Sequence, residues 1–350
     1  MTASASPALA TARPWEPGRV SWSLLALFPL GLGLLSLTIG RFEISVAQVL
    51  TILGLPLLPA EAISATAERV ILLIRLPRVL EALTIGAGLG ITGTALQGVF
   101  RNPLVGPQII GVSTGAAFGG TLAIFFGLGL AAMMGTAFVF GLLALSIVFL
   151  LARVDGRSAV LMLVLAGVVV SAFFGALVSL LTYLADPDDS LPAIVYWLMG
   201  SFAAAAWPKL GGVVAITAAG GGVLCLLRFR INVLSLGDEE AQALGVPVEG
   251  LRWAVLLAVT AIVSAGVAVA GVVGWVGLVV PHLARMLVGP DHRLLLPASA
   301  LVGAGYMVLV DTVARSLTVA EIPLGILTAI IGAPVFAWLL RKTQAGGWKS

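Results

Sequence analysis

Ten runs of apolar residues, most of them long enough to cross a lipid bilayer as a helix, dominate this sequence. They lie near residues 22–40, 79–100, 108–127, 130–152, 159–183, 209–227, 253–272, 273–288, 294–313 and 322–340. A transmembrane helix needs about 20 mainly apolar residues. The least distinct boundary is that between the seventh and eighth runs, where Gly271 and Gly274 are the only interruption. The pattern predicts an all-α, polytopic membrane protein with ten transmembrane helices.

The scarcity of charge excludes a water-soluble fold. Only 10% of the 350 residues are charged and 60% are hydrophobic, with a mean hydropathy of +1.12, whereas soluble domains are about 25% charged. The 42 glycines fit closely packed membrane helices, whose interfaces are rich in small residues. Lipid is therefore the expected solvent for most of the chain.

The distribution of basic residues predicts the orientation. With the N-terminus inside, thirteen Lys and Arg fall on cytoplasmic segments and six on outer segments, as the positive-inside rule requires. We therefore expect a multi-pass protein of the bacterial inner membrane, with a cytoplasmic tail at 1–20, a ten-span domain at 21–342 and a second cytoplasmic tail at 343–350. The first apolar run lacks a small-residue cleavage pattern, which favours an uncleaved span over a signal peptide.

Two connecting segments are too polar and too patterned to be simple turns. Residues 186–202 are expected to form a short interfacial helix on the outer side. Residues 228–250 are expected on the cytoplasmic side as a helix–turn–helix, with acidic residues at a helix start and Gly245-Val246-Pro247 as a stop. The second segment is the longest candidate surface for a cytoplasmic partner.

No pattern in the chain indicates chemistry of its own. Gly111, Ser113 and Gly115 match the G-x-S-x-G nucleophile elbow, but that motif needs a preceding strand and His and Asp partners, and both flanks here are apolar. Gly111, Gly115 and Gly119 instead predict a small-residue helix face. The two histidines have no metal-ligand spacing, no P-loop is present, and the scattered basic residues form no nucleic-acid stripe. We expect no catalytic residue, no metal site and no cofactor bound by this chain.

A polytopic membrane chain without chemistry of its own is expected to move a solute across the bilayer. Its source of energy is left open between two classes. An ion-coupled carrier usually places ionisable residues within its spans. Glu81 lies one turn from Arg78, and Asp311 lies four residues before Arg315, so each acid is expected to pair with the nearby arginine on its own helix. Because no carboxylate lies at the middle of a span, an external energy source is favoured.

Three basic residues on the expected outer face have two interpretations. Arg75, Arg78 and Arg315 depart from the positive-inside bias. They could anchor helix ends at the interface, or offer bidentate sites for carboxylates of an extracytoplasmic protein. Physical reasoning alone leaves both interpretations open.

Several well-separated blocks of sequence resemble the FecCD-type permeases of ABC importers, which carry iron–siderophore complexes, haem and cobalamin. The resemblance covers about 41–342, and its blocks are Arg75–Arg78, Gly93–Gln97, Asn102–Leu104, Gly111–Ala116, Leu236–Val246, Gly277–His282 with Arg285, Asp291–Arg293, Asp311–Arg315 and Glu321–Phe336. Each block is weak alone, but their occurrence in this order is specific.

The resemblance implies partners and roles for named residues. It implies two permease copies, as a homodimer in most relatives, two cytoplasmic ATPases that use MgATP, and a periplasmic substrate-binding protein. It assigns docking of the binding protein to Arg75, Arg78 and Arg315. It assigns ATPase coupling to Leu236, Gly237, Asp238, Glu239, Glu240, Ala241, Leu244 and Gly245, and helix packing or the translocation path to Gly93, Gln97, Asn102, Pro103, Gly111, Ser113 and Gly115.

The identity of the cargo and the internal symmetry rest on weaker signals. A ferric siderophore is expected because that cargo is common in the family, with haem and cobalamin as the other candidates. Pro103–Pro107 and Met286–Pro290 are faintly similar, which hints at an inverted repeat of four spans on either side of the sixth. The alternative function is an ion-coupled secondary transporter that acts without an ATPase.

Overall fold

The computed structural model describes residues 21–153 and 159–345, and every regular element in those ranges is a helix. The helices are α1 (Trp22–Thr38), α2 (Val46–Ile52), α3 (Ala65–Arg69), α4 (Leu76–Phe100), α5 (Val112–Phe125), α6 (Leu130–Ala152), α7 (Val160–Leu184), α8 (Ser190–Leu198), α9 (Trp207–Leu234), α10 (Asp238–Ala243), α11 (Val248–Ala270), α12 (Val276–Val288), α13 (His292–Ser316) and α14 (Leu324–Ala345). Short 3₁₀ turns occupy Ala60–Ala62 (η1) and Pro107–Ile110 (η3), and a π-helical segment, Val70–Arg75 (η2), joins α3 to α4.

Each of the ten apolar runs coincides with one helix of the described chain, but these helices differ in length. Five of them, α6, α7, α9, α11 and α13, are long and apolar enough to cross a membrane. The apolar helices α1, α5 and α12, and the 324–338 part of α14, are shorter. The all-helical membrane architecture is therefore confirmed, while crossing by all ten helices stays a prediction.

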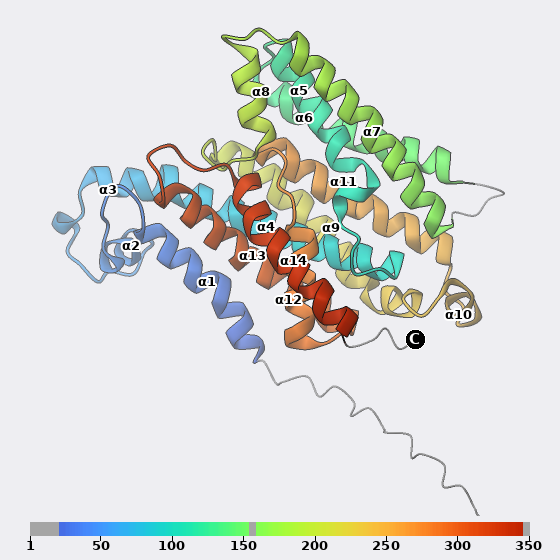
Figure 1. Cartoon of the computed structure of the whole chain (residues 1–350). Helices are drawn as coiled ribbons and strands as arrows, with labels where there is room; N and C mark the ends of the chain where they lie inside the picture. The colour runs from blue at the N-terminus through green and yellow to red at the C-terminus, as the bar shows by residue number, and fades with distance from the viewer. Residues whose placement is uncertain (1–20, 154–158, 346–350) are drawn as a thin grey trace, which may run out of the picture.

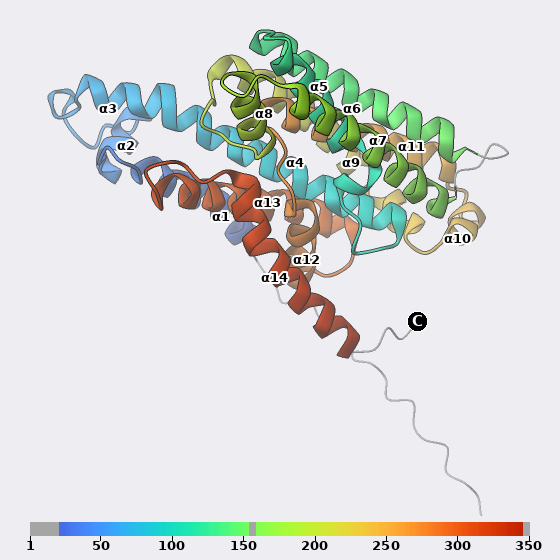
Figure 2. The same ribbon diagram turned by 45° about the horizontal axis from the view of Figure 1, so that its top comes forward.

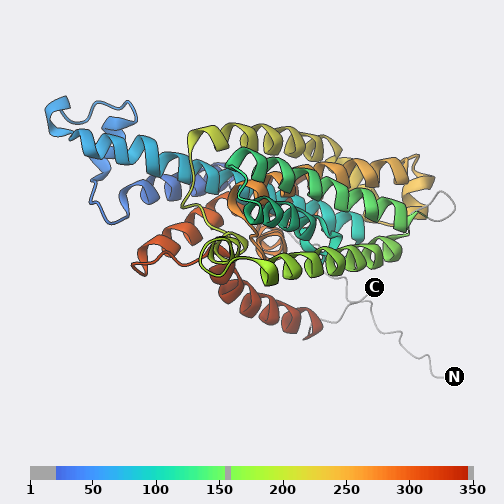
Figure 3. The same cartoon turned by 90° about the horizontal axis from the view of Figure 1, so that it is seen from above.

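The long helices run roughly along one axis, so the bundle has two ends (Figure 1). One end holds Arg75, Arg78 and Arg315 and is called the arginine end below. The opposite end holds α10 and is called the α10 end. Turning the molecule shows α6, α7 and α9 on the outside of the bundle, with α4 running through its middle (Figures 2 and 3).

Burial separates the core helices from those that face the surroundings. In their most apolar windows, α6, α7 and α9 are only 28%, 28% and 22% buried, whereas α11 is 78% and α13 is 67% buried. Every residue of α4 from Gly88 to Phe100 is buried. Apolar side chains that remain exposed on so many helices are expected of a protein whose solvent is lipid.

Glycines allow α4 to approach its neighbours at backbone distance. A Cβ atom on Gly86 would lie 2.2 Å from the carbonyl oxygen of Gly303 in α13, and one on Gly93 would lie 2.0 Å from that of Gly277 in α12. Such contacts replace the hydrophobic effect, which lipid does not supply between helices. The small-residue face of α5 is confirmed in the same way, because a Cβ on Gly119 would lie 2.3 Å from the backbone of α6.

Helix lengths on either side of α9 repeat in order. Helices α4, α5, α6 and α7 have 25, 14, 23 and 25 residues, and α11, α12, α13 and α14 have 23, 13, 25 and 22. In each set a break in the α-helical structure precedes the short second helix. The break before α5 consists of residues 101–106 and the 3₁₀ turn η3, and the break before α12 consists of residues 271–275. The segment equivalent to 103–107 by position is thus 271–275, not the 286–290 stretch that the sequence similarity suggested.

Two expected boundaries differ in the structure. Helix α9 continues to Leu234, two turns beyond the apolar run, because no helix breaker follows residue 227. The connection between α9 and α11 is therefore shorter than 228–250, although the expected short helix within it is present as α10. The expected N-terminal tail lies outside the described residues, as do 346–350, and 343–345 continue α14. A helix is also present where an interfacial one was expected, as α8.

Candidate translocation path and coupling surface

A network of buried ion pairs joins three segments at the arginine end. The guanidinium of Arg78 in α4 donates three hydrogen bonds of 2.8–3.0 Å to both oxygens of Asp311 in α13. The same guanidinium donates two bonds of 2.9 Å to Glu321, in the segment that leads into α14. The side chain of Asp311 is only 1% exposed, so this carboxylate depends on its cationic partners rather than on solvent.

Arg75 and Arg315 at this end complete the C-terminus of α1. Arg75 donates to the carbonyl oxygens of Leu37, at 2.7 Å, and Phe42, at 2.6 Å. Arg315 donates to the carbonyl oxygens of Ser36 and Ile39. Basic side chains commonly satisfy the last carbonyls of a helix in this way. Both arginines therefore hold α1 against α4 and α13.

These contacts correct one expected pair and change the view of the docking residues. Within the described chain, Arg78 forms its hydrogen bonds with Asp311 and Glu321 rather than with Glu81, and Asp311 also lies 3.8 Å from Arg315. Because Arg75 and Arg78 are 6% and 8% exposed, their donors are used inside the protein. The structure gives Arg75, Arg78 and Arg315 the role of joining helices, and docking by them stays a prediction.

The segment expected to couple to an ATPase, around α10, is joined to the bundle by one buried arginine. Asp238, the first residue of α10, accepts bonds of 2.9 and 2.8 Å from Arg252 of α11. The Arg252 side chain is 2% exposed and also lies 3.4 Å from Glu249. Arg101, which ends α4, lies 3.9 Å from Asp238. Helix α10 thus contacts α11 and the end of α4 through a single carboxylate.

Exposed side chains on either side of α10 form a contact surface. Leu236 and Leu244 are 64% and 65% exposed, while Ala241 between them is buried and Glu239 and Glu240 face outward. Gly237 (φ +148°) and Gly245 (φ +77°) adopt conformations that favour glycine. Beside α10 lies a groove lined by Asp238, Glu239, Gln242, Glu249 and other residues. This acidic surface with two apolar side chains has the character of a protein interface.

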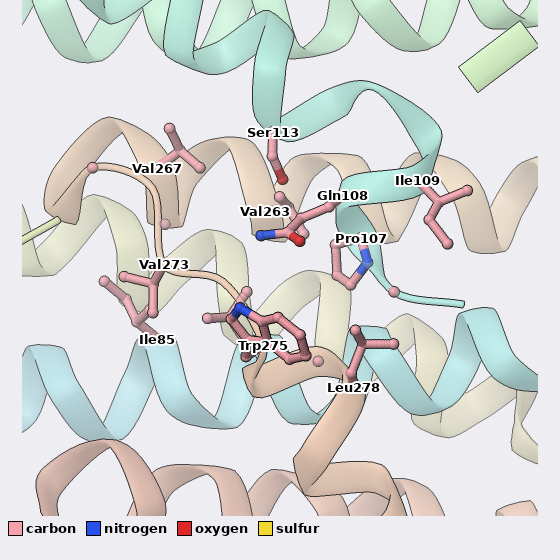
Figure 4. Close-up of a pocket in the computed structure, with 15 residues that line it drawn as sticks. Ile85, Pro107, Gln108, Ile109, Ser113, Val263, Val267, Val273, Trp275 and Leu278 are labelled. Atoms are coloured by element: carbon pink, nitrogen blue, oxygen red, sulfur yellow. The ribbon is translucent and has the colours of Figure 1, made fainter. Parts of the chain in front are cut away.

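A pocket lies in the middle of the bundle, where α5 and α12 begin (Figure 4). Its cavity volume is about 50 Å³. Its lining residues are Ile85, Leu89, Gly106, Pro107, Gln108, Ile109, Ser113, Val263, Gly266, Val267, Gly271, Val273, Trp275, Gly277 and Leu278. None of these residues is charged. The pocket is therefore a mainly apolar chamber with two polar side chains, Gln108 and Ser113.

The structure distributes the expected path residues over three places. Ser113 lines the central pocket. Gly93, Gly111 and Gly115 lie at helix contacts, with α12, α7 and α6 respectively. Gln97 is two turns nearer the α10 end than Leu89, and its Oε1 accepts a 3.0 Å bond from Arg285.

Asn102 and Pro103 follow α4 at the same end, and the Asn102 side chain accepts a 2.9 Å bond from the backbone of Leu104. The expected path residues thus support helix packing more than the lining of a cavity.

Three residues that the sequence did not single out prove important to these sites. From the sequence, Arg252 was predicted only to be a basic residue on a cytoplasmic segment, because nothing in the sequence indicates that its side chain is buried. Gln108 lies in a segment that reads as the start of an apolar run. Trp275 has φ +67°, a conformation that a bulky residue rarely adopts. The two glycines that precede it, Gly271 and Gly274, were the one sequence feature that indicated an irregular backbone at Trp275.

Comparison with known proteins agrees with this architecture. A model of the FecCD transport family matches residues 26–342. The molybdate import system permease protein MolB of Haemophilus influenzae is 50% identical over 313 residues, which are 89% of this chain and 93% of that protein. The hemin transport system permease protein HmuU of Yersinia pestis is 43% identical, over 77% of this chain and 83% of that one. A solved structure described as an inward-facing conformation of a metal-chelate type ABC transporter has a TM-score of 0.84 at 48% identity, covering 92% of this chain and 98% of that chain. The chain therefore belongs to the FecCD transport family.

Proposed function

We propose that this chain is the permease of an ABC importer for a metal oxyanion of the molybdate class. The observation that carries the proposal is the 50% identity to a molybdate permease across about nine tenths of both chains. The hemin permease HmuU is 43% identical to this chain over a shorter stretch of 282 residues.

The chain itself is an ABC permease subunit and not an enzyme, since ATP hydrolysis in this family belongs to a partner ATPase. We place that ATPase at the α10 end, on the cytoplasmic side, with MgATP bound by the ATPase alone. The exposed Leu236 and Leu244 and the tie between Asp238 and Arg252 support this placement. A periplasmic binding protein then delivers cargo at the arginine end, to a homodimer whose ten helices per copy all cross the membrane.

Other cargoes of the family form the second candidate. Ferric siderophore was the expectation from sequence, and haem and iron-chelate permeases are among the relatives at 41–43% identity. The mostly apolar lining of the pocket is the observation that keeps such chelates as candidates. Membership of the family disfavours an ion-coupled carrier. So do the positions of Glu81 and Asp311, which lie near the arginine end of the bundle rather than at the centre of their helices.

Reconstitution tests the proposal directly. The permease should copurify with its ATPase, and proteoliposomes that contain both should take up molybdate only when ATP and the binding protein are supplied. Uptake of a ferric siderophore but not molybdate would replace the proposed cargo and keep the permease function. Uptake by the permease alone, abolished by an uncoupler, would establish the ion-coupled alternative.

A further inference from the structure

Two short helices begin at the central pocket and run from it toward opposite ends of the bundle. Figure 4 shows the first turn of α5, with Ser113, above the pocket and the first turn of α12, with Trp275 and Leu278, below it. Helix α5 has 14 residues and α12 has 13. Both are discontinuous elements whose first turns lie inside the bundle rather than at its surface.

Neither helix is capped by a side chain. The N-cap residues Gly111 (φ +81°) and Trp275 (φ +67°) both have left-handed backbone, and neither makes a side-chain capping bond. The N–H groups of a first helical turn have no partner further along the helix. In α12 two of the three donate to the backbone oxygens of residues 274 and 275, which leaves the N–H of Gly277. The helix dipole adds partial positive charge at each terminus. Two such termini that face one chamber make it favourable for negative charge.

A buried hydroxyl provides an independent sign of a ligand. Ser113 is 7% exposed and lines the pocket, and its oxygen is directed into the chamber (Figure 4). This hydroxyl makes no hydrogen bond to any residue that the structure describes. The side-chain amide of Gln108 projects into the same chamber and has no such bond either. Buried polar groups are normally paired, so the Ser113 hydroxyl is suited to a molecule that occupies the pocket. The Gln108 side chain is exposed, and its amide is placed to contact the same molecule.

We propose that this pocket is a transit site for a tetrahedral oxyanion, held by the first turns of α5 and α12, the Ser113 hydroxyl and the Gln108 amide. Discontinuous membrane helices direct their positive ends at anionic groups of substrates in other transporters. A metal cation does not fit, because no carboxylate lines the pocket. A site without a fixed cation holds a dianion weakly, which allows release on the other side.

This inference rests on the proposed function and adds the site at which the chain holds that cargo during transport. The test uses the assembled complex of permease and ATPase in proteoliposomes, with binding protein and radiolabelled molybdate. Because hydrogen bonds to charged groups are strong, Ser113→Ala should lower the rate of uptake at low molybdate on the order of tenfold. Ser113→Asp places a carboxylate among the donors and should abolish uptake.

A matched control removes an equivalent group outside the pocket. Ser264 in α11 is fully buried, its hydroxyl has no hydrogen bond within the described chain, and it lies against Gly141 of α6. Ser264→Ala should therefore transport molybdate at the wild-type rate. If Ser113→Asp does not assemble with the ATPase, Gln108→Glu introduces the same charge at an exposed position of the chamber and should also abolish uptake.

The outcomes separate this inference from the proposed function. Wild-type rates in Ser113→Asp or Gln108→Glu would overturn the oxyanion site while leaving the importer in place. ATP-dependent uptake of a ferric chelate without any uptake of molybdate would also overturn it. Failure of the wild-type chain to assemble with an ATPase would instead count against the proposed function itself. Equal losses in Ser113→Ala and Ser264→Ala would show that packing, not anion contact, is responsible.

Discussion

The pair between Arg78 and Asp311 predicts a large difference between two chemically identical substitutions. Asp311→Asn removes the negative charge from a side chain that is 1% exposed and accepts three hydrogen bonds from Arg78. The amide can accept at only one of its two positions and presents an N–H donor at the other. Arg78 and Arg315 would then remain buried with less compensating charge.

The size of the loss follows from what remains around Arg78. Breaking a buried ion pair costs about 3–5 kcal/mol. Because Glu321 keeps its two bonds to Arg78, we expect the lower end, about 3 kcal/mol of unfolding free energy. The same change at Asp291 is the control. Its partner Arg293 is 56% exposed and holds the pKa of Asp291 below its usual value, and Asn caps a helix as well as Asp, so a loss under about 1 kcal/mol is expected.

Titration of the purified protein in mixed micelles with a denaturing detergent, followed by tryptophan fluorescence and circular dichroism, measures both losses. Equal small losses for the two variants would refute the view that the buried pair joins α4 to α13. A further variant tests the cause. Replacing the pair by Arg78→Met with Asp311→Leu should recover much of the lost stability, since apolar side chains need no ionic partner. Failure of this double variant to exceed Asp311→Asn would contradict the electrostatic explanation.

Three further predictions concern coupling and packing. Arg252→Gln should leave the ATPase bound but lower uptake per ATP hydrolysed by about tenfold, since it loses charge-assisted bonds to the coupling helix; normal coupling would exclude this route. Leu244→Asp, at a 65% exposed position, should weaken copurification of the ATPase, and unchanged copurification would place the interface elsewhere. Gly93→Ala should cost about 1–3 kcal/mol because its Cβ would meet the backbone of Gly277, whereas Gly222→Ala, with no atom within 4 Å, should cost nothing in the same detergent titration.

The sequence predicted the helices well because the apolar runs themselves are the signal. Each run lies on one helix, and the glycine spacing in α5 correctly indicated close packing against α6. Distances between helices were not predictable, since they depend on tertiary contacts that a single sequence does not record. Arg78 was therefore expected to pair with Glu81 on its own helix, whereas Asp311 lies 233 positions away along the chain. Burial of Arg75 was hidden for the same reason, because an arginine that caps a neighbouring helix has the same sequence context as an exposed one.

The contacts of Asp238 join the proposed ATPase surface to the central pocket through rigid helices. Arg252 and Arg101 join the start of α10 to α11 and to the end of α4, and both helices also line the central pocket, through Val263 and Leu89. At 1.5 Å per residue, the 11 residues from Arg252 to Val263 and the 12 from Leu89 to Arg101 span about 16 and 18 Å of rigid helix. A displacement of α10 therefore needs no flexible relay. It moves two walls of the chamber together, while the first turn of α12, which packs on Gly93 of α4, is carried with them.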